Sequence, residues 1–121
     1  MLELHNVDLI IPKGEESKAR EFYCDLLSLS EIQKPEVLQK NGGFWLQLGN
    51  AQLHLSYEKK EGVDPRRTKA HIAFRVTDLK KLRNELESRG FTVKEQEQIP
   101  GMIRMESEDP FGHRLEFLQL I

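Results

Sequence analysis

The stretch "HNVDLIIP" at residues 5–12 is echoed by "HIAFRVTD" at residues 71–78. Both alternate apolar and polar residues and are rich in β-branched residues, which is typical of a strand with one buried face. Each is followed by a segment with apolar residues at helical spacing. The two stretches therefore predict two copies of one strand–helix unit. When the two strands are aligned, His71 corresponds to Asn6, one residue after His5, so the copies differ at this position.

The first predicted unit continues beyond its helix with three more strands. Pro12 ends the first strand, and "EESKAREFYCDLLS" predicts an amphipathic helix. A strand in "SEIQK" and an irregular or briefly helical "PEVLQKNGG" follow. Gly49 and Asn50 then join "FWLQL" and "AQLHLSY" into a hairpin. The order is βαβββ.

The second predicted unit has the same order. Its first strand, "AHIAFRV", precedes a helix that Thr77 or Asp78 caps and Gly90 closes. The strands "FTVKE", "MIRMES" and "HRLEFLQL" follow, with a "DPFG" turn before the last. We expect one domain over residues 1–121, with module one at about 1–57, a charged surface connector at about 58–68 and module two at about 69–121.

Composition excludes several classes of partner. The 18 basic residues nearly balance the 20 acidic residues, so we expect no nucleic acid or membrane partner. No stretch approaches the roughly 18 to 20 apolar residues that cross a bilayer, and "MLELHNVDL" is unlike a signal peptide, so we expect a cytoplasmic protein. The single cysteine, Cys24, is expected to be a buried thiol without chemistry.

Strand parity predicts one polar face shared by both units. Aligning the copies pairs Asn6 with His71, and His54 with Glu116. Alternation places these four residues on one face, together with Asp8, Gln52, Ser56, Ala73, Arg75 and Arg114. If the two sheets curve toward each other, this face lines a cleft, and both histidines and the glutamate converge there.

The chain resembles the vicinal oxygen chelate superfamily, which includes glyoxalase I, extradiol dioxygenases, and fosfomycin- and bleomycin-resistance proteins. The resemblance rests on the paired modules, "KAHIAFRV" and "EDPFGHRLEFLQ". It implies an α+β fold, with a curved, open, mostly antiparallel sheet around a cleft that holds a divalent metal. Mapped position by position, the metal ligands fall on Asn6, His54, His71 and Glu116. Asn6 is a departure, because most metal-binding members have histidine there.

Two imidazoles and one carboxylate suit Zn, Fe, Mn or Ni and leave positions open for a substrate. Asn6 would be a weak ligand or a bystander. A lone histidine on a strand, in contrast, is more often a hydrogen-bonded structural residue. His5 and His113 are expected at the surface.

Five further residues are candidates for contacts with a small-molecule substrate. Arg75 and Arg114 would bind an anionic substrate or form salt bridges within the cleft. Trp45 would form an apolar wall for a ligand or pack in the core. Gln52 and Ser56 are substrate-binding candidates because they lie on the polar face.

Three functions follow from the resemblance. The first is a metal-dependent, glyoxalase-like lyase or isomerase that acts on a substrate with adjacent oxygens, with Glu116 as the base. The second is an extradiol-type dioxygenase with the same ligands. The third is a metal-free drug-binding protein like the bleomycin-resistance members, which Asn6 favours. We also expect a homodimer, because two small modules do not enclose a deep cleft alone.

Overall fold

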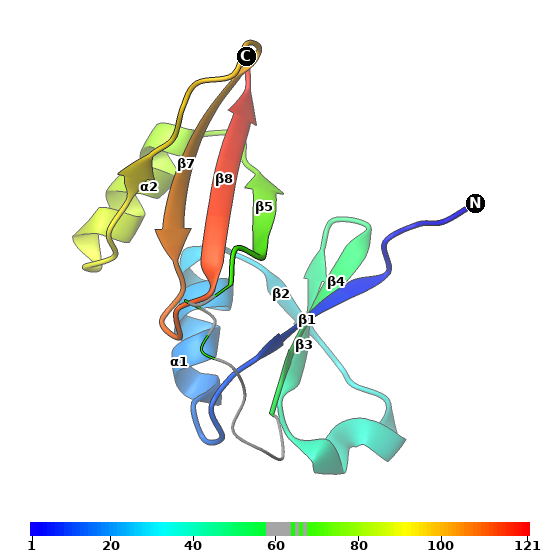
Figure 1. Ribbon diagram of the computed structural model, residues 1–121. Coiled ribbons are helices and arrows are strands. Elements are labelled where there is room, and N and C mark those ends of the chain that lie inside the picture. Colours follow the sequence, from blue (N-terminus) through cyan, green and yellow to red (C-terminus); the bar gives the residue numbers. More distant parts are fainter. Residues whose placement is uncertain (58–63, 65, 67) are drawn as a thin grey trace. The chain divides into compact units, whose positions relative to one another are not determined.

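The computed structural model describes residues 1–57, 64, 66 and 68–121 (Figure 1). The chain forms two compact units, Met1–Gly62 and Val63–Ile121. Each unit holds a four-stranded sheet and its own helix, so the predicted α+β class and the two βαβββ modules are confirmed. The expected surface connector lies largely outside the described residues.

The first unit builds its sheet in the order β1-β4-β3-β2. Its elements are β1 (Asn6–Ile10), α1 (Glu16–Arg20), the π-helix η1 (Glu21–Leu26), β2 (Ser30–Ile32), the 3₁₀ helix η2 (Glu36–Asn41), β3 (Phe44–Leu48) and β4 (Ala51–Ser56). Strand β1 pairs with β4 in parallel, and the other pairs are antiparallel. The β3–β4 turn uses Gly49 at φ +57°.

One face of this sheet packs into a core with the helices. Its side chains Phe44, Leu46, Leu53 and Leu55 are buried, as are Ala19, Phe22, Tyr23 and Leu26 from α1 and η1. The Arg20 guanidinium lies 4.3 Å from the centre of the Phe44 ring, which fixes α1 against β3. Cys24 is only half-buried, contrary to expectation. Helical spacing turns it away from the stripe that its neighbours Phe22 and Leu26 bury.

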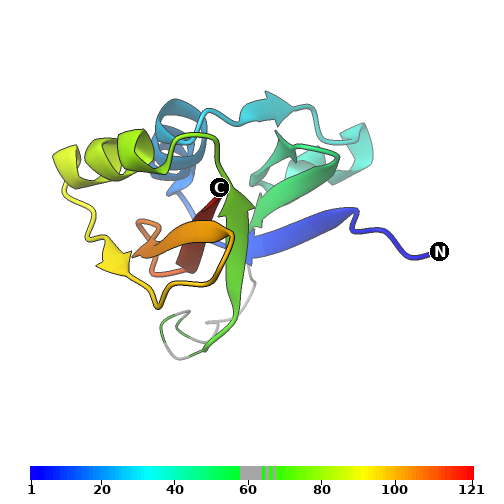
Figure 2. The same cartoon turned by 90° about the horizontal axis from the view of Figure 1, so that it is seen from above.

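The second unit repeats the arrangement, in the order β5-β8-β7-β6. Its elements are β5 (His71–Arg75), α2 (Leu79–Ser88), β6 (Lys94–Glu95), β7 (Met102–Glu108) and β8 (Arg114–Leu120). The Asp78 side chain caps α2 by accepting from the Lys81 backbone N–H at 3.0 Å. The Leu79 N–H donates to Gln119 Oε1 at 2.8 Å and ties α2 to β8. Both views show α2 on one side of the β7–β8 pair (Figure 2).

The "DPFG" turn between β7 and β8 is organised by the buried Asp109. One of its oxygens accepts from the backbone N–H groups of Phe111 and His113, at 2.9 and 2.8 Å. The other lies 2.7 Å from His113 Nδ1. The expectation that His113 lies at the surface is therefore wrong, since its side chain is 11% exposed. The turn folds the ring back onto Asp109. His5 is exposed as expected.

None of the helices among the described residues has the length and apolar character that crossing a membrane requires.

Candidate functional site

The two units place their candidate residues in the same strand register. Asn6 and His71 are the first residues of β1 and β5. Asp8, two residues after Asn6, pairs with His54 of β4. Ala73, two residues after His71, pairs with Glu116 of β8. Asn6 is thus positioned toward His54 as His71 is toward Glu116. The alignment of the two copies, made on sequence alone, matches the pairing of the strands.

In the first unit, His54 is held at both ring nitrogens. Asn6 Nδ2 lies 3.3 Å from His54 Nδ1, and Gln52 Oε1 lies 2.9 Å from His54 Nε2. An amide NH₂ group only donates and an amide oxygen only accepts, so Nδ1 accepts and Nε2 carries the proton. The ring is therefore the neutral Nε2–H tautomer. Burial lowers the pKa of His54, against a smaller opposing effect of the Asp8 carboxylate.

Trp45 lies directly against this histidine. The two residues are opposite each other in the β3–β4 pair. Their ring centroids are 3.8 Å apart and the ring planes differ by 3°, so the rings are stacked. Hydrogen bonds at both edges of the imidazole and stacking on its face hold the pair rigidly. The sheet thus presents a flat aromatic wall.

This wall borders a hollow of about 910 Å³ whose lining residues all belong to the first unit. Its lining consists of Asp8, Lys13, Lys34, Leu38, Lys40, Asn41, Gly42, Trp45, His54, Ser56 and Tyr57. The polar side of the sheet contributes Asp8, Trp45, His54 and Ser56, and the Ser56 hydroxyl donates to Asp8 Oδ2 at 3.0 Å. Residues 34–42 contribute a large part of the remaining lining.

Sequence reasoning placed Trp45, His54 and Ser56 at this site but missed the lysines and Tyr57. Gln52 is not part of the lining and instead positions His54. The missed residues lie outside the strands, where alternation gives no prediction. A signal was nevertheless present for two of the lysines, because Lys34 begins "KPEVLQKNGG" and Lys40 is its seventh residue.

In the second unit, Glu116 is buried in an ion pair. It is 7% exposed, and its Oε1 lies 2.9 Å from Arg104 Nη1. Arg114 Nε lies 2.8 Å from Glu106 Oε1. Of the two roles expected for Arg114, substrate binding or a salt bridge, the structure shows the salt bridge. Arg75 is exposed and forms no ion pair with another described residue. His71 is exposed, and its Nδ1 donates to the Lys69 carbonyl at 3.1 Å.

Within each unit, other groups of the protein engage several of the atoms that would bind a metal ion. Asn6 turns its amide nitrogen, which has no lone pair to offer, toward His54, and its oxygen lies 3.0 Å from His5 Nδ1. Both His54 nitrogens are engaged by amides, and one oxygen of Glu116 is engaged by Arg104. Within neither unit do three of the described His, Cys, Asp or Glu side chains form a group that could hold a metal. The metal ligand set stays a prediction.

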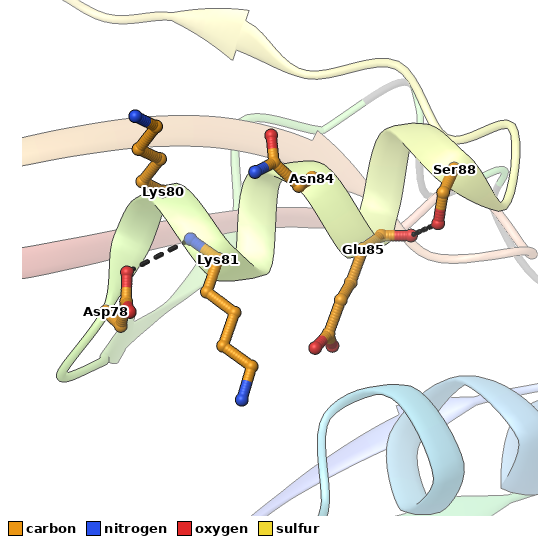
Figure 3. A pocket seen from close by; sticks show the side chains of 6 residues that line it. All are labelled: Asp78, Lys80, Lys81, Asn84, Glu85 and Ser88. Atoms are coloured by element: carbon orange, nitrogen blue, oxygen red, sulfur yellow. Dashed lines mark hydrogen bonds between the residues drawn. The ribbon is translucent and has the colours of Figure 1, made fainter.

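A second hollow, of about 470 Å³, lies along the outer surface of α2 (Figure 3). Lys80 and Asn84 point away from Lys81 and Glu85 in the close-up, so these side chains do not converge on one point. Ser88 donates to the carbonyl of Glu85 at 2.8 Å. This surface has no aromatic wall and no converging polar groups. The hollow beside Trp45 is therefore the better candidate for a binding site.

Comparison with known proteins places the sequence in context. The family model of the Glyoxalase/Bleomycin resistance protein/Dioxygenase superfamily matches residues 7–117. A solved structure from Bacillus anthracis, named for the glyoxalase family, is 35% identical, with a TM-score of 0.87 and coverage of 100% of this chain and 97% of that chain. No protein with a curated description matches the sequence.

Two more distant structures share the fold. The fosfomycin resistance protein FosX from Listeria monocytogenes is 16% identical, with a TM-score of 0.78, and the match covers 100% of this chain and 95% of that chain. TnmS3, an antibiotic binding protein from Streptomyces sp. CB03234, is 16% identical, with a TM-score of 0.74 and coverage of 100% and 98%. At these identities the similarity shows the fold alone.

Proposed function

Because the chain belongs to the Glyoxalase/Bleomycin resistance protein/Dioxygenase superfamily, we propose that it binds a small organic molecule in the hollow beside Trp45 and His54, with side chains rather than a metal ion as the recognition groups. Members of the superfamily commonly use divalent metals. The similar folds also include an antibiotic binding protein. Binding of a small organic molecule is therefore compatible with this fold.

The observation that carries the proposal is the state of His54. Its two nitrogens are satisfied by Asn6 and Gln52, and its face is covered by Trp45. A ring held in this way serves as a fixed wall, and a ligand that binds against it does not have to order it first. The size of the hollow, about 910 Å³, is in the range of small-molecule sites.

Trp45 provides the test, because it is the only tryptophan of the chain. A screen of small aromatic compounds should find ligands that change its fluorescence saturably, and the change should persist in EDTA. His54→Ala should weaken binding by about tenfold, since it removes the wall that supports Trp45. His71→Ala, in the second unit, is the matched control and should bind normally. Binding that EDTA and His71→Ala both abolish would contradict the proposal.

A second candidate, the metal-dependent lyase or dioxygenase with Glu116 as a functional carboxylate, is favoured by one observation. The Asn6–His54 and His71–Glu116 pairs occupy equivalent register positions in the two copies. This candidate requires His54 to leave Asn6 or Gln52, and Glu116 to leave Arg104, in order to bind a metal. Elemental analysis of protein purified without chelators, followed by calorimetric titration with Zn²⁺ and Mn²⁺, tests it. A stoichiometric metal that Glu116→Ala removes would support this candidate.

The homodimer also remains a proposal. Two modules of this size would gain a deeper cleft from a second copy of the chain. Sedimentation at tens of micromolar tests this independently of the ligand.

A further inference from the structure

We propose that the hollow of the first unit selects aromatic organic anions, recognised by Lys13, Lys34 and Lys40. This inference rests on the proposed function and names the class of ligand. It follows from the charge of the lining, from the construction of its rim and from the shape of its wall.

The lining carries an excess of positive charge. Three lysines face one carboxylate, that of Asp8, and the Ser56 hydroxyl already donates to that carboxylate. None of the three lysines forms an ion pair with an acidic side chain of the described residues. His54 adds no charge, because its Nδ1 accepts a hydrogen bond from Asn6. The described residues that line the hollow therefore carry a net charge of +2, from three lysines and one carboxylate, in a chain whose net charge is −2.

The rim that carries two of these lysines is tied together. The Lys34 ammonium donates to the carbonyl of Gly42, and Gln39 Nε2 donates to the carbonyl of Lys34 at 3.2 Å. An ammonium has three N–H donors, so Lys34 keeps donors for a ligand while it closes the rim. Gly42 has φ +72°, and a side chain there would overlap the Tyr57 ring. Hydrogen bonds and the close approach of Gly42 to Tyr57 thus hold the rim in place, and Lys34 is positioned before a ligand arrives.

The wall specifies the rest of the ligand. The Trp45 indole lines the hollow and is held flat by its stacking on His54. A flat indole favours a planar ring, which stacks on it in an offset arrangement. Compact ammonium groups beside it favour an anionic substituent on that ring. An aromatic carboxylate combines the two features.

The test compares three probes of similar size: benzoate, benzamide and benzylamine. Trp45 fluorescence and calorimetry should show benzoate binding about tenfold more tightly than benzamide, and benzylamine binding most weakly. Raising NaCl from about 20 mM to about 500 mM should weaken benzoate and leave benzamide unchanged, because salt screens exposed charges.

Variants assign the charge to the hollow. Lys13→Gln/Lys34→Gln/Lys40→Gln should bring the affinity for benzoate down to that for benzamide. Lys18→Gln/Lys69→Gln/Lys80→Gln removes the same three charges from positions that do not line the hollow, so both variants change the net charge from −2 to −5. This control should keep the preference. Lys13→Gln/Lys40→Gln leaves the Lys34–Gly42 bond in place and should lose part of the preference while folding normally.

The outcomes separate the inference from the proposed function. Benzamide binding as tightly as benzoate would overturn the anion preference and leave the binding site intact. Equal losses in the hollow variant and the control variant would overturn it as well, because the charges would then act at long range. If neither these probes nor any screened compound bound, the proposed function itself would be wrong.

Discussion

Replacing Arg104 with methionine should destabilise the second unit more than any other single loss of charge on its polar face. Arg104 donates to two acceptors, Glu116 Oε1 and the carbonyl of Glu97, both at 2.9 Å. Its side chain is 22% exposed and that of Glu116 is 9% exposed. The substitution removes the cation and leaves the carboxylate of Glu116 buried without its countercharge.

The magnitude follows from this burial. Breaking a fully buried pair costs about 3–5 kcal/mol, and an exposed pair contributes about 0–1 kcal/mol. The Arg104–Glu116 pair lies between these limits, so we expect a loss of about 2–3 kcal/mol at neutral pH. Glu116→Gln, combined with Arg104→Met, should recover about half of the loss.

Urea unfolding followed by circular dichroism measures these differences, since the only tryptophan lies in the first unit. Arg114→Met is the matched control. It breaks a pair with Glu106 of similar length, 2.8 Å, in the same sheet, but its side chain is 40% exposed. We expect a loss of about 1 kcal/mol or less for the control. Equal losses for the Arg104 and Arg114 variants would refute the reasoning from burial.

Three further predictions concern the fold. Asp78→Ala removes the cap of α2 and should cost about 1 kcal/mol in urea unfolding. Gly43→Ala should cost about 2 kcal/mol or more, because its φ is +73° and a Cβ would overlap the Leu55 carbonyl, whereas Gly49→Ala in open space should cost about 1 kcal/mol. Burial raises the pKa of Cys24, so iodoacetamide should alkylate it more slowly at pH 8 in native than in unfolded protein.

Each of these has a result that would contradict it. Asp78→Asn keeps a capping oxygen and should restore most of the stability, so a loss as large as that of alanine would exclude capping as the cause. Equal costs at Gly43 and Gly49 would show that the close approach to Leu55 does not matter. An alkylation profile of Cys24 whose midpoint lies at or below that of the unfolded chain would contradict the effect of burial.

Much of the fold was readable because its signals are local. Alternation in "HNVDLIIP" and "HIAFRVTD" predicted β1 and β5, and the Gly49–Asn50 pair predicted the β3–β4 hairpin. The repeat also predicted which residues of the two copies are equivalent, since aligning the copies on sequence matched Asn6 with His71, and these residues have equivalent register positions. The positions of Asp8, His54 and Ser56 on one face followed from the same parity, which needs no tertiary information, whereas Trp45 was expected only as an apolar wall or a core residue.

The partners of those residues were not readable. Asn6 and His54 are 48 positions apart in the sequence, and whether an amide turns its nitrogen or its oxygen to an imidazole depends on rotamers and on neighbours such as His5. Glu116 has the same difficulty, because three of the seven residues of β7 carry charge and only the three-dimensional arrangement selects Arg104 for it. Sequence parity fixes the face of a side chain but not its partner.

Duplication of a module preserves geometry more strictly than chemistry. Strand pairing uses backbone groups that every residue supplies, so the two copies keep one register while their side chains diverge. In the first copy, the amide of Asn6 satisfies an imidazole nitrogen of His54, and a neutral aromatic wall results. In the second copy, the buried carboxylate of Glu116 takes an arginine as its countercharge. Each copy has thus satisfied its buried polar group within its own sheet. Residues outside the strands, such as Lys34 and Lys40, would then set the ligand preference of the proposed binding site without disturbing the strand register beneath it.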